Sequence, residues 1–375
     1  MGIHDRPYYR AGSGQPPRHP LPRGWSATVW IIALCVAVFV VDGFLPKGAE
    51  PVGSRLADGL TAAEVRSLDP SDVRLQVPQQ VSRDVAIGQA GYVDPATGSA
   101  TLLGEVEYRV NHPLQRWGYF STARAVYGTD PILGSTGYEV WRFITFQFLH
   151  ANQTHLLFNM LTLWFFGPMV ERFLGTKRYV AFYLLCGVAG ALCYLLLNGL
   201  AIGGQAAFGE SFRLPGLLFN DPTTPLVGAS AGVFGVIMAC AYLAPNAEVA
   251  LFFVIPMRLG TLAYGLLGFA LLAVIFGWSN AGGEAAHIGG ALAGWWLIRN
   301  PAHLHGLLDF VGQYDPTSRV ARARAGMRRS AGGPVGRDPG AAEVNRILDK
   351  ITAQGLHSLS EDEKRTLREA SRRSR

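Results

Sequence analysis

Three segments of the sequence place polar or ionisable side chains inside apolar surroundings. The first contains His150, His155 and Asn159, the second is a Gly-x-Ser-x-Gly run centred on Ser230, and the third contains His287. An ionisable group in a hydrocarbon environment costs on the order of 2 to 3 kcal/mol or more, so such groups are candidates for a functional role. A serine hydroxyl that an imidazole deprotonates is a nucleophile. The segments therefore contain the residue types that acyl transfer requires.

Each segment by itself also fits a structural role. His155 and Asn159 lie four residues apart on one helix face, where they could be packing residues, and a lone His287 could be a satisfied polar contact. The five letters around Ser230 also match the nucleophile elbow of soluble hydrolases, but that motif needs a strand-to-helix turn in an α/β sheet. The sequence supplies no such sheet.

Two pairs of glycines have the spacing of helix-packing residues. Gly228 and Gly232 lie four residues apart around Ser230, and Gly290 and Gly294 lie four residues apart after His287. Small residues at this spacing form a smooth helix face that allows two backbones to approach closely in a membrane. The pattern therefore predicts close contact between the helices that carry Ser230 and His287.

The composition excludes a water-soluble globule. Of 375 residues, 49% are hydrophobic and only 16% are charged, whereas soluble domains have about a quarter charged residues. The apolar content is too high for a disordered chain. Four cysteines are too few for a disulfide scaffold of this length, and all of them lie in apolar runs. The composition points to a membrane protein.

The apolar runs are long enough to cross a bilayer, for which about 20 residues are needed. We predict spanning helices at residues 25–44, 154–173, 179–200, 226–243, 259–278 and, shorter, 284–299. The first run is too long for the core of a signal peptide and is interpreted as a retained signal anchor. The apolar stretch at residues 249–256 is too short to span and is expected at the membrane interface.

With six spanning helices, the lysines and arginines near the helix ends all fall on one side of the membrane. Because positively charged loops favour the cytoplasmic side, we predict that both termini are cytoplasmic. Helices two, four and six then run inward from the outer face, so His155, Ser230 and His287 have similar depths. Ser230 would lie about 6 Å below Leu226 at 1.5 Å per residue. A hydroxyl so close to a helix amino terminus lies near unbonded N–H groups and the positive end of the helix dipole.

The remaining segments have different characters. Residues 1–24 form a cytoplasmic tail before the first helix at 25–44, and residues 45–138 form a long extracytoplasmic loop or insertion, with short strands at patterns such as residues 105–110. Residues 139–300 hold the other five predicted spans. Residues 301–340 form a flexible basic linker, and residues 341–375 form a small helical cytoplasmic tail that opens its second helix at Ser360.

Together the motifs resemble the rhomboid family of intramembrane serine proteases. The matching residues are His150-x4-His155-x3-Asn159, Gly228-Ala229-Ser230-Ala231-Gly232, Ala286-His287-x2-Gly290-x3-Gly294, Trp141-Arg142 and Glu171-Arg172-x2-Gly175. The resemblance covers residues 138–300. It implies an all-α membrane protein, a six-transmembrane-helix rhomboid-like bundle, that cleaves single-pass transmembrane substrates in the lipid bilayer near its outer boundary, with no cofactor, no metal and no nucleic acid.

The resemblance also implies roles for individual residues. Ser230 would be the nucleophile and His287 its general base. His155 and Asn159 would donate to the oxyanion beside the backbone N–H of Ser230, and His150 would support this cluster. Phe234 falls one turn after Ser230, where the family places an aromatic ring against the histidine. Glu284 lies three residues before His287 and could reach it, but the family works with a dyad, so no contact is expected.

Three other interpretations remain to be compared with this one. A catalytically inactive rhomboid-like protein that binds membrane helices would keep the glycine faces but lose Ser230 or His287, and both are present. A transporter would have polar groups at mid-depth and an inverted repeat. A zinc protease would need a His-Glu-x-x-His run. The membrane is expected to be the bacterial inner membrane, although the amino-terminal arginines leave an organelle open, and the partner of the tail is unknown.

Overall fold

The computed structural model describes residues 25–304, apart from 83, 127, 131, 252 and 253, together with 343–344, 346–347, 349–350 and 359–373. The chain forms two compact units, Met1–Leu308 and Asp309–Arg375, which are described separately. The predicted tail at residues 1–24 and most of the predicted linker at residues 301–340 lie outside the described residues.

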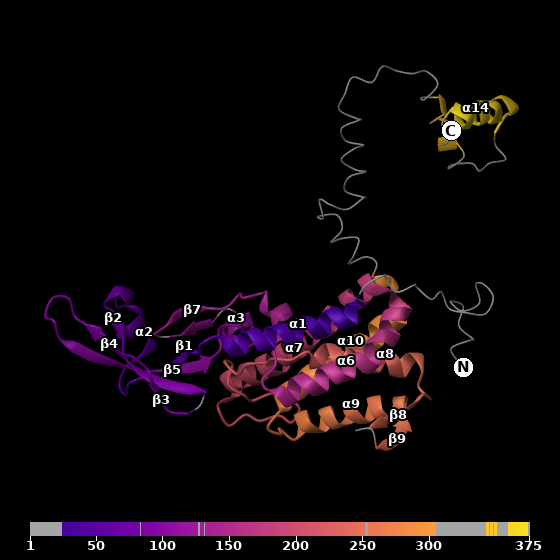
Figure 1. Ribbon diagram of the computed structural model, residues 1–375. Coiled ribbons are helices and arrows are strands. Elements are labelled where there is room, and N and C mark those ends of the chain that lie inside the picture. The colour runs from indigo at the N-terminus through magenta and orange to yellow at the C-terminus, as the bar shows by residue number, and fades with distance from the viewer. Residues whose placement is uncertain are drawn as a thin grey trace. The chain divides into compact units, whose positions relative to one another are not determined.

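Long helices form the main body of the first unit (Figure 1). α10 packs against α7, α8 and α9, and α8 also contacts α6 and α7, so α8 lies inside the bundle. Each apolar run that the sequence identified as a span overlaps one of these helices, although α6, α7 and α10 extend beyond the predicted bounds. They are α1 (Ala27–Phe44), α6 (Gln153–Leu174), α7 (Thr176–Phe208), α8 (Ser230–Leu243), α9 (Leu259–Ile275) and α10 (Ala281–Arg299).

The helices differ in length. Among the described residues, α1 and α7 are each long and apolar enough to cross a bilayer, whereas α8 and α9 are apolar but shorter. The 33 residues of α7 correspond to about 50 Å, more than the roughly 30 Å of a hydrocarbon core.

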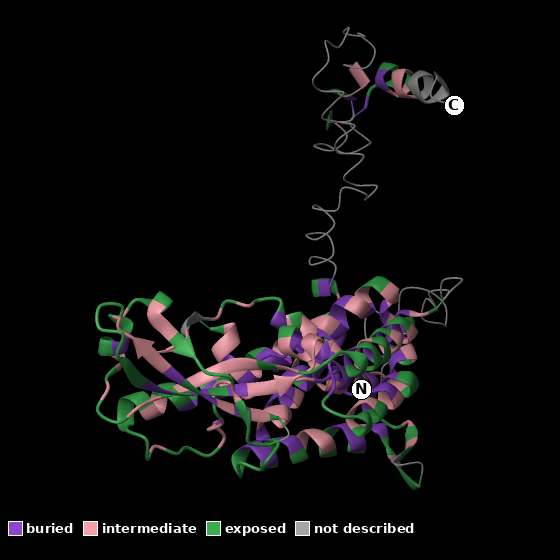
Figure 2. Ribbon diagram, turned by 60° about the vertical axis from the view of Figure 1, so that its left-hand side comes forward, coloured by how far each residue is buried: buried purple, intermediate pink, exposed green. Residues whose placement is uncertain are grey.

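These helices expose large apolar side chains, and Figure 2 shows exposed residues, in green, along them. Examples are Trp30 on α1, Phe165 on α6, Phe269 on α9 and Trp296 on α10. Apolar surface exposed on this scale marks contact with a membrane or another protein. It fits a helical membrane protein.

The insertion before the bundle contains a β-sheet, so the all-α class was wrong for residues 45–138, whereas the short strand predicted at residues 105–110 is confirmed within β5. The sheet is antiparallel and five-stranded, in the order β1-β5-β4-β2, with β3 also pairing to β4. Its strands are β1 (Gly48–Leu56), β2 (Val73–Leu75), β3 (Gln79–Gln80), β4 (Val85–Val93) and β5 (Ala100–Asn111). We call it the accessory sheet.

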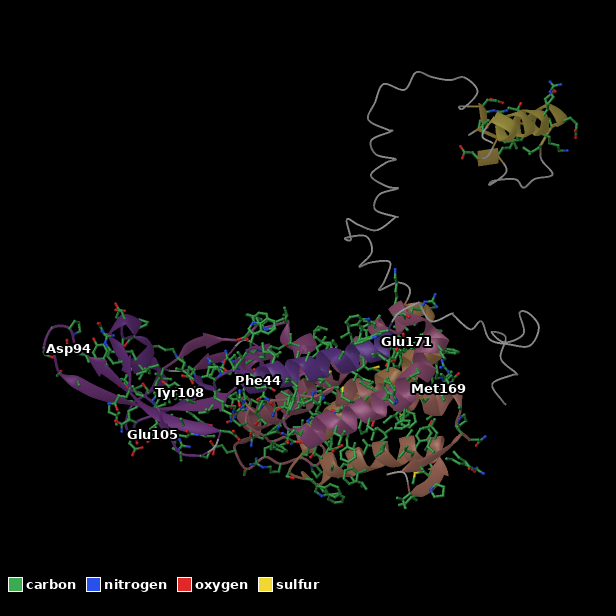
Figure 3. All side chains as sticks on the ribbon, in the orientation of Figure 1. Phe44, Asp94, Glu105, Tyr108, Met169 and Glu171 are labelled. Atoms are coloured by element: carbon green, nitrogen blue, oxygen red, sulfur yellow. The ribbon has the colours of Figure 1, made fainter. Side chains whose placement is uncertain are left out.

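The accessory sheet has a hydrophobic core of its own, which explains why the insertion folds. Along β5, Val106 and Tyr108 are buried while Glu105 and Glu107 are exposed, the period of two that a sheet with one covered face requires. Val65 on α2 (Ala62–Arg66) packs into the same cluster. Figure 3 shows Asp94 at the tip of the sheet farthest from the helices and Phe44 where α1 meets it.

Short elements complete the first unit. They are the 3-10 helices η3 (Pro70–Asp72) and η4 (Phe146–Phe148), the helices α3 (Pro113–Gly118), α4 (Thr122–Ala125) and α5 (Arg142–Thr145), and the hairpins β6 (Gly128–Asp130) with β7 (Gly134–Thr136) and β8 (Glu248–Leu251) with β9 (Ile255–Arg258). The segment expected at the membrane interface, residues 249–256, contributes its described residues 249–251 to β8 and 255–256 to β9.

A chain of ion pairs joins the accessory sheet to the bundle. Arg124 pairs with Glu50 of β1 and with Glu139, whose other oxygen accepts from Arg142 Nε at 2.5 Å. Arg142 is 3% exposed and also donates to the Tyr119 carbonyl at 2.7 Å. On another path, Arg109 of β5 donates to the Thr223 carbonyl at 2.7 Å. The ion pairs thus join the sheet to α4 and α5, and the Arg109 contact joins it to the loop that precedes α8.

At the other end of the bundle, a buried carboxylate caps the amino terminus of α1. Glu171 of α6 accepts hydrogen bonds from the Ala27 and Thr28 backbone N–H groups at 2.8 and 3.0 Å, and from the Thr28 hydroxyl at 2.8 Å. A carboxylate at a helix amino terminus satisfies N–H groups that lack intrahelical partners. Figure 3 shows Glu171 at the end of the bundle remote from the accessory sheet.

Glycines allow α8 and α10 to touch along their backbones. A Cβ atom at Gly290 would clash with the backbone carbonyl of Ala231, and one at Gly294 would clash with the backbone of Gly235. Gly232, in contrast, faces the ring of Tyr183 on α7. The close approach of α8 and α10 therefore depends on Gly290 and Gly294, while Gly232 serves the contact between α8 and α7.

We expect Gly290→Ala to destabilise the protein, because the added methyl group must push α8 away from α10. Overpacking of this kind costs about 1 to 3 kcal/mol, which thermal unfolding of the purified protein in detergent would detect. Gly268→Ala on α9 is the matched control, since nothing lies within 4 Å of a Cβ atom there, and alanine favours a helix over glycine. Equal melting temperatures for the two variants would contradict this account of the contact.

In the second unit, α14 (Glu361–Arg373) begins where the sequence predicted a second helix. The Glu363 carboxylate accepts from the Ser360 N–H at 2.9 Å and from Lys350 Nζ at 2.9 and 3.0 Å. These contacts lower the pKa of Glu363 to about 2. The Glu363 N–H in turn donates to Ser360 Oγ at 3.3 Å, so Ser360 is the capping acceptor that the sequence predicted.

Candidate active site

Ser230 is the first residue of α8, which begins four residues later than the predicted span at 226–243. Leu226 pairs with Phe120 in a β-bridge, and Gly228 has φ +136°, so the chain before Ala229 cannot be helical. The backbone N–H of Ser230 therefore belongs to the first turn, where N–H groups lack intrahelical acceptors. The hydroxyl and this N–H lie together at the positive end of the helix dipole.

Ser230, His155 and His287 line one cavity of about 670 Å³. They come from α8, α6 and α10, which are far apart in the sequence. Other polar residues of the lining are Asn152, Tyr194, Asn220, Thr224, Ser279 and Asn280. Among the described residues no hydrogen bond joins Ser230 Oγ to His287, and catalytic hydrogen bonds often tighten only when substrate binds.

Two neighbours hold the imidazole of His287. The Phe234 ring stacks on it with centroids 4.1 Å apart and planes 10° from parallel. The Nδ1 atom lies 2.9 Å from Glu284 Oε2, and both side chains are mostly buried. The expectation that Glu284 would not contact His287 was therefore wrong, because three residues on a helix place two side chains on one face. With Nδ1 engaged, Nε2 is the nitrogen left for the hydroxyl.

His155 lies against the turn before Ser230. Its backbone N–H donates to Asn152 Oδ1 at 2.9 Å, which caps α6. A Cβ atom at Gly228 would lie 2.8 Å from His155 Nε2 and 3.4 Å from Ser230 Oγ. Gly228 was expected to serve helix packing, but it precedes α8. Its missing side chain and its positive φ instead allow the His155 ring to approach the serine.

Asn159 and His150 lie outside the lining of this cavity. Asn159 is 6% exposed, and its amide donates to the His155 carbonyl one turn earlier at 3.0 Å, which leaves one amide hydrogen. The His150 ring lies edge-on to that of His155, with centroids 5.2 Å apart. Burial lowers the pKa of His150 to about 3, so this imidazole is neutral at physiological pH. His150 lines a second cavity of about 750 Å³, beside α1 and the accessory sheet.

Two lining residues were missed by sequence reasoning. Asn220 Nδ2 donates to the Tyr194 hydroxyl at 3.1 Å, and this hydroxyl donates to the Thr224 carbonyl at 3.3 Å. Tyr194 lies within an apolar run and Asn220 within a loop, and neither belongs to a recognisable motif. The spacing of polar residues in the sequence therefore gave no reason to place these two residues in the site.

Comparison with known proteins yields two family matches. Residues 137–300 match the Rhomboid domain, and residues 337–373 match a family of unknown function, DUF6576. These stretches correspond to the helical bundle after the accessory sheet and to the carboxy-terminal unit. The described site residues all fall within the first match.

Individual relatives match the bundle. The chain is 33% identical over 153 residues to "RHOMBOID-like protein 12, mitochondrial" of Arabidopsis thaliana, covering 40% of this chain and 42% of the relative. It is 31% identical over 173 residues to "Rhomboid protease AarA" of Providencia stuartii, covering 43% and 56%. "Rhomboid protease GlpG" of Salmonella newport is 27% identical over 169 residues, covering 44% and 49%. The chain thus spans about half the length of the relatives that it matches.

Proposed function

The chain is a rhomboid family protein, and we propose that it is an intramembrane serine endopeptidase. Its substrates would be single-pass transmembrane proteins, cut near the outer boundary of the bilayer. Ser230 is the nucleophile and His287 the general base. The observation that carries this proposal is the common cavity of Ser230, His155 and His287, with the serine at the first turn of α8.

The proposed reaction proceeds in two steps. The Ser230 hydroxyl transfers its proton to His287 Nε2 as its oxygen bonds to the scissile carbonyl carbon, and the carbonyl oxygen becomes an oxyanion. Collapse of this intermediate breaks the C–N bond, and His287 gives its proton to the leaving amine. Water then attacks the acyl carbon with His287 again as base, the ester C–O bond breaks as His287 returns the proton to Ser230 Oγ, and the fragment leaves with a new carboxyl group.

The oxyanion needs donors that are already in place. The backbone N–H of Ser230 is free of helical bonding, and the His155 ring lies beside the same turn. Asn159 could add its remaining amide hydrogen after a side-chain rotation. A single preorganised donor of this kind contributes a factor of about 10² to 10³ in kcat. We assign His155 and the Ser230 N–H as the main donors and Asn159 as a secondary one.

In the membrane, we infer that α1, α6, α7, α8, α9 and α10 each span and that both termini are cytoplasmic. This orientation follows from the positions of lysine and arginine at the helix ends. Pro225 and Val227 line both the catalytic cavity and the second cavity, which is also lined by Arg109 and Asp84 of the accessory-sheet segment. Water would enter from this outer side. We propose a bacterial inner membrane, while relatives with mitochondrial names exist.

A fluorophosphonate probe tests the proposal directly, because it bonds only to an activated serine. We expect the purified full chain in detergent to be labelled, with the adduct mapped to Ser230 by mass spectrometry. His287→Ala should slow labelling by about 10² to 10⁴, the contribution of a general base. Absence of labelling from a folded protein, or labelling of a different serine, would instead indicate an inactive protein that only binds membrane helices.

A further inference from the structure

The contact between Glu284 and His287 goes beyond a serine-histidine pair. We propose that Glu284 is a positioning residue that holds the His287 imidazole in its reactive tautomer and stabilises the imidazolium formed during catalysis. This inference rests on the proposed function. It turns the site into a serine, histidine and carboxylate arrangement built from the first turn of α8 and the first two turns of α10.

The geometry of the carboxylate supports this role. Glu284 Oε2 lies 2.9 Å from His287 Nδ1, and Glu284 Oε1 accepts from Asn280 Nδ2 at 3.3 Å. Both carboxylate oxygens therefore have a donor. Asn280 is the residue before α10, and its side chain packs on Gly283, where a Cβ atom would come within 2.7 Å of Asn280 Oδ1. The missing side chain of Gly283 thus leaves room for Asn280 to reach the Glu284 carboxylate.

The imidazole is restrained from its other sides as well. Phe234 covers one ring face at 4.1 Å, and His287 lines the catalytic cavity, while Glu284 is not among the lining residues. The carboxylate thus binds the nitrogen remote from the serine. An acceptor at Nδ1 requires that nitrogen to carry the hydrogen, so Nε2 keeps its lone pair. That is the tautomer in which a histidine can remove a proton from Ser230.

The proposed role of Glu284 needs no further reactant, because protons and charges balance at each step. When Ser230 gives its proton to Nε2, the ring becomes a cation that still donates its Nδ1 hydrogen to Glu284. The carboxylate keeps its charge throughout, and the proton leaves with the amine when the C–N bond breaks. Glu284 touches neither the substrate nor the reacting atoms. It acts through His287.

The competing explanation is structural. Glu284 lies in the first turn of α10, where a carboxylate stabilises a helix through its dipole without any role in chemistry. The two explanations differ in what a substitution changes. A structural role would lower the melting temperature and leave kcat of the folded protein unchanged, whereas a positioning role would lower kcat at unchanged KM.

The experiment compares Glu284→Gln, Glu284→Asp and Glu284→Ala in the full chain, with Glu210→Gln as control because that carboxylate lies on an exposed loop. Cleavage of a single-pass substrate would be measured alongside the melting temperature. We expect Glu284→Gln to lower kcat by about 10² or more with KM within about twofold, since loss of the orienting carboxylate costs up to 10⁴ in a triad. Glu284→Asp should recover part of this loss.

Chemical rescue adds a measurement that separates the two explanations, because added formate would not raise kcat if Glu284 had only a structural role. Formate added to Glu284→Ala should raise kcat in a concentration-dependent manner, while formamide should not. Wild-type kcat in Glu284→Gln, or equal kcat for the Asp and Ala variants with no rescue, would overturn the inference. The proposed protease function would survive that result, because its own tests are the labelling of Ser230 and the loss of cleavage in Ser230→Ala.

Discussion

Ser230→Ala should abolish cleavage of a single-pass membrane substrate while leaving the protein folded. The substitution removes the only group assigned to attack the carbonyl, and loss of a catalytic serine lowers kcat by at least about 10⁴-fold in serine proteases. Ser230 is a small residue at the first turn of α8, so a methyl group in its place leaves the helix contacts intact. Mass spectrometry of the substrate after incubation in liposomes measures the effect.

The control for this experiment is Ser279→Ala. Ser279 also lines the cavity, yet it is given no part in the reaction. We expect this variant to cleave at nearly the wild-type rate. If the Ser230→Ala protein still produced the wild-type fragment, another nucleophile or a contaminating protease would be responsible, and the proposed mechanism would have to be abandoned.

His155→Ala should also give a large effect, a loss of about 10² to 10³ in kcat with little change in KM. The reason is that an oxyanion donor acts on a charge that exists only in the transition state. Asn159→Ala should cost less, because its amide already bonds to the His155 carbonyl and it does not line the cavity. Steady-state kinetics on one fluorogenic membrane substrate would separate the two residues.

Thr162→Val on the same helix is the matched control for these variants. Its hydroxyl bonds to the Phe158 carbonyl on the exposed side of α6, so it should leave kcat unaltered. An equal loss for Asn159→Ala and His155→Ala would show that the amide turns toward the oxyanion when substrate binds. A rise in KM at constant kcat for His155→Ala would contradict the oxyanion assignment and make this residue part of substrate binding.

The regions that could be recognised from the sequence alone have a common physical origin. Polar groups are costly in an apolar helix, so His155, Ser230 and His287 stand out against their surroundings. Likewise, the spacing of Gly290 and Gly294 indicated a helix face that another backbone must approach. Both signals are local, because each depends only on residues within about two turns of one helix.

What the sequence could not determine depends on contacts between distant segments. The start of α8 at Ser230 follows from the pairing of Leu226 with Phe120 and from the positive φ of Gly228, which no periodicity encodes. The accessory sheet was visible only through alternation such as that at Glu105 to Val110, because five strands must pair before their shared core exists.

The sequence by itself therefore determined a helical membrane protein and the residue types of its candidate site. Only the tertiary structure decided how those residues are used. It set the His155 ring against Gly228, turned the Asn159 amide back onto its own helix and brought Glu284 to His287. The physical reason is that residue type sets what a side chain can do, while rotamer and packing, which depend on the neighbours in space, set which partner it finds.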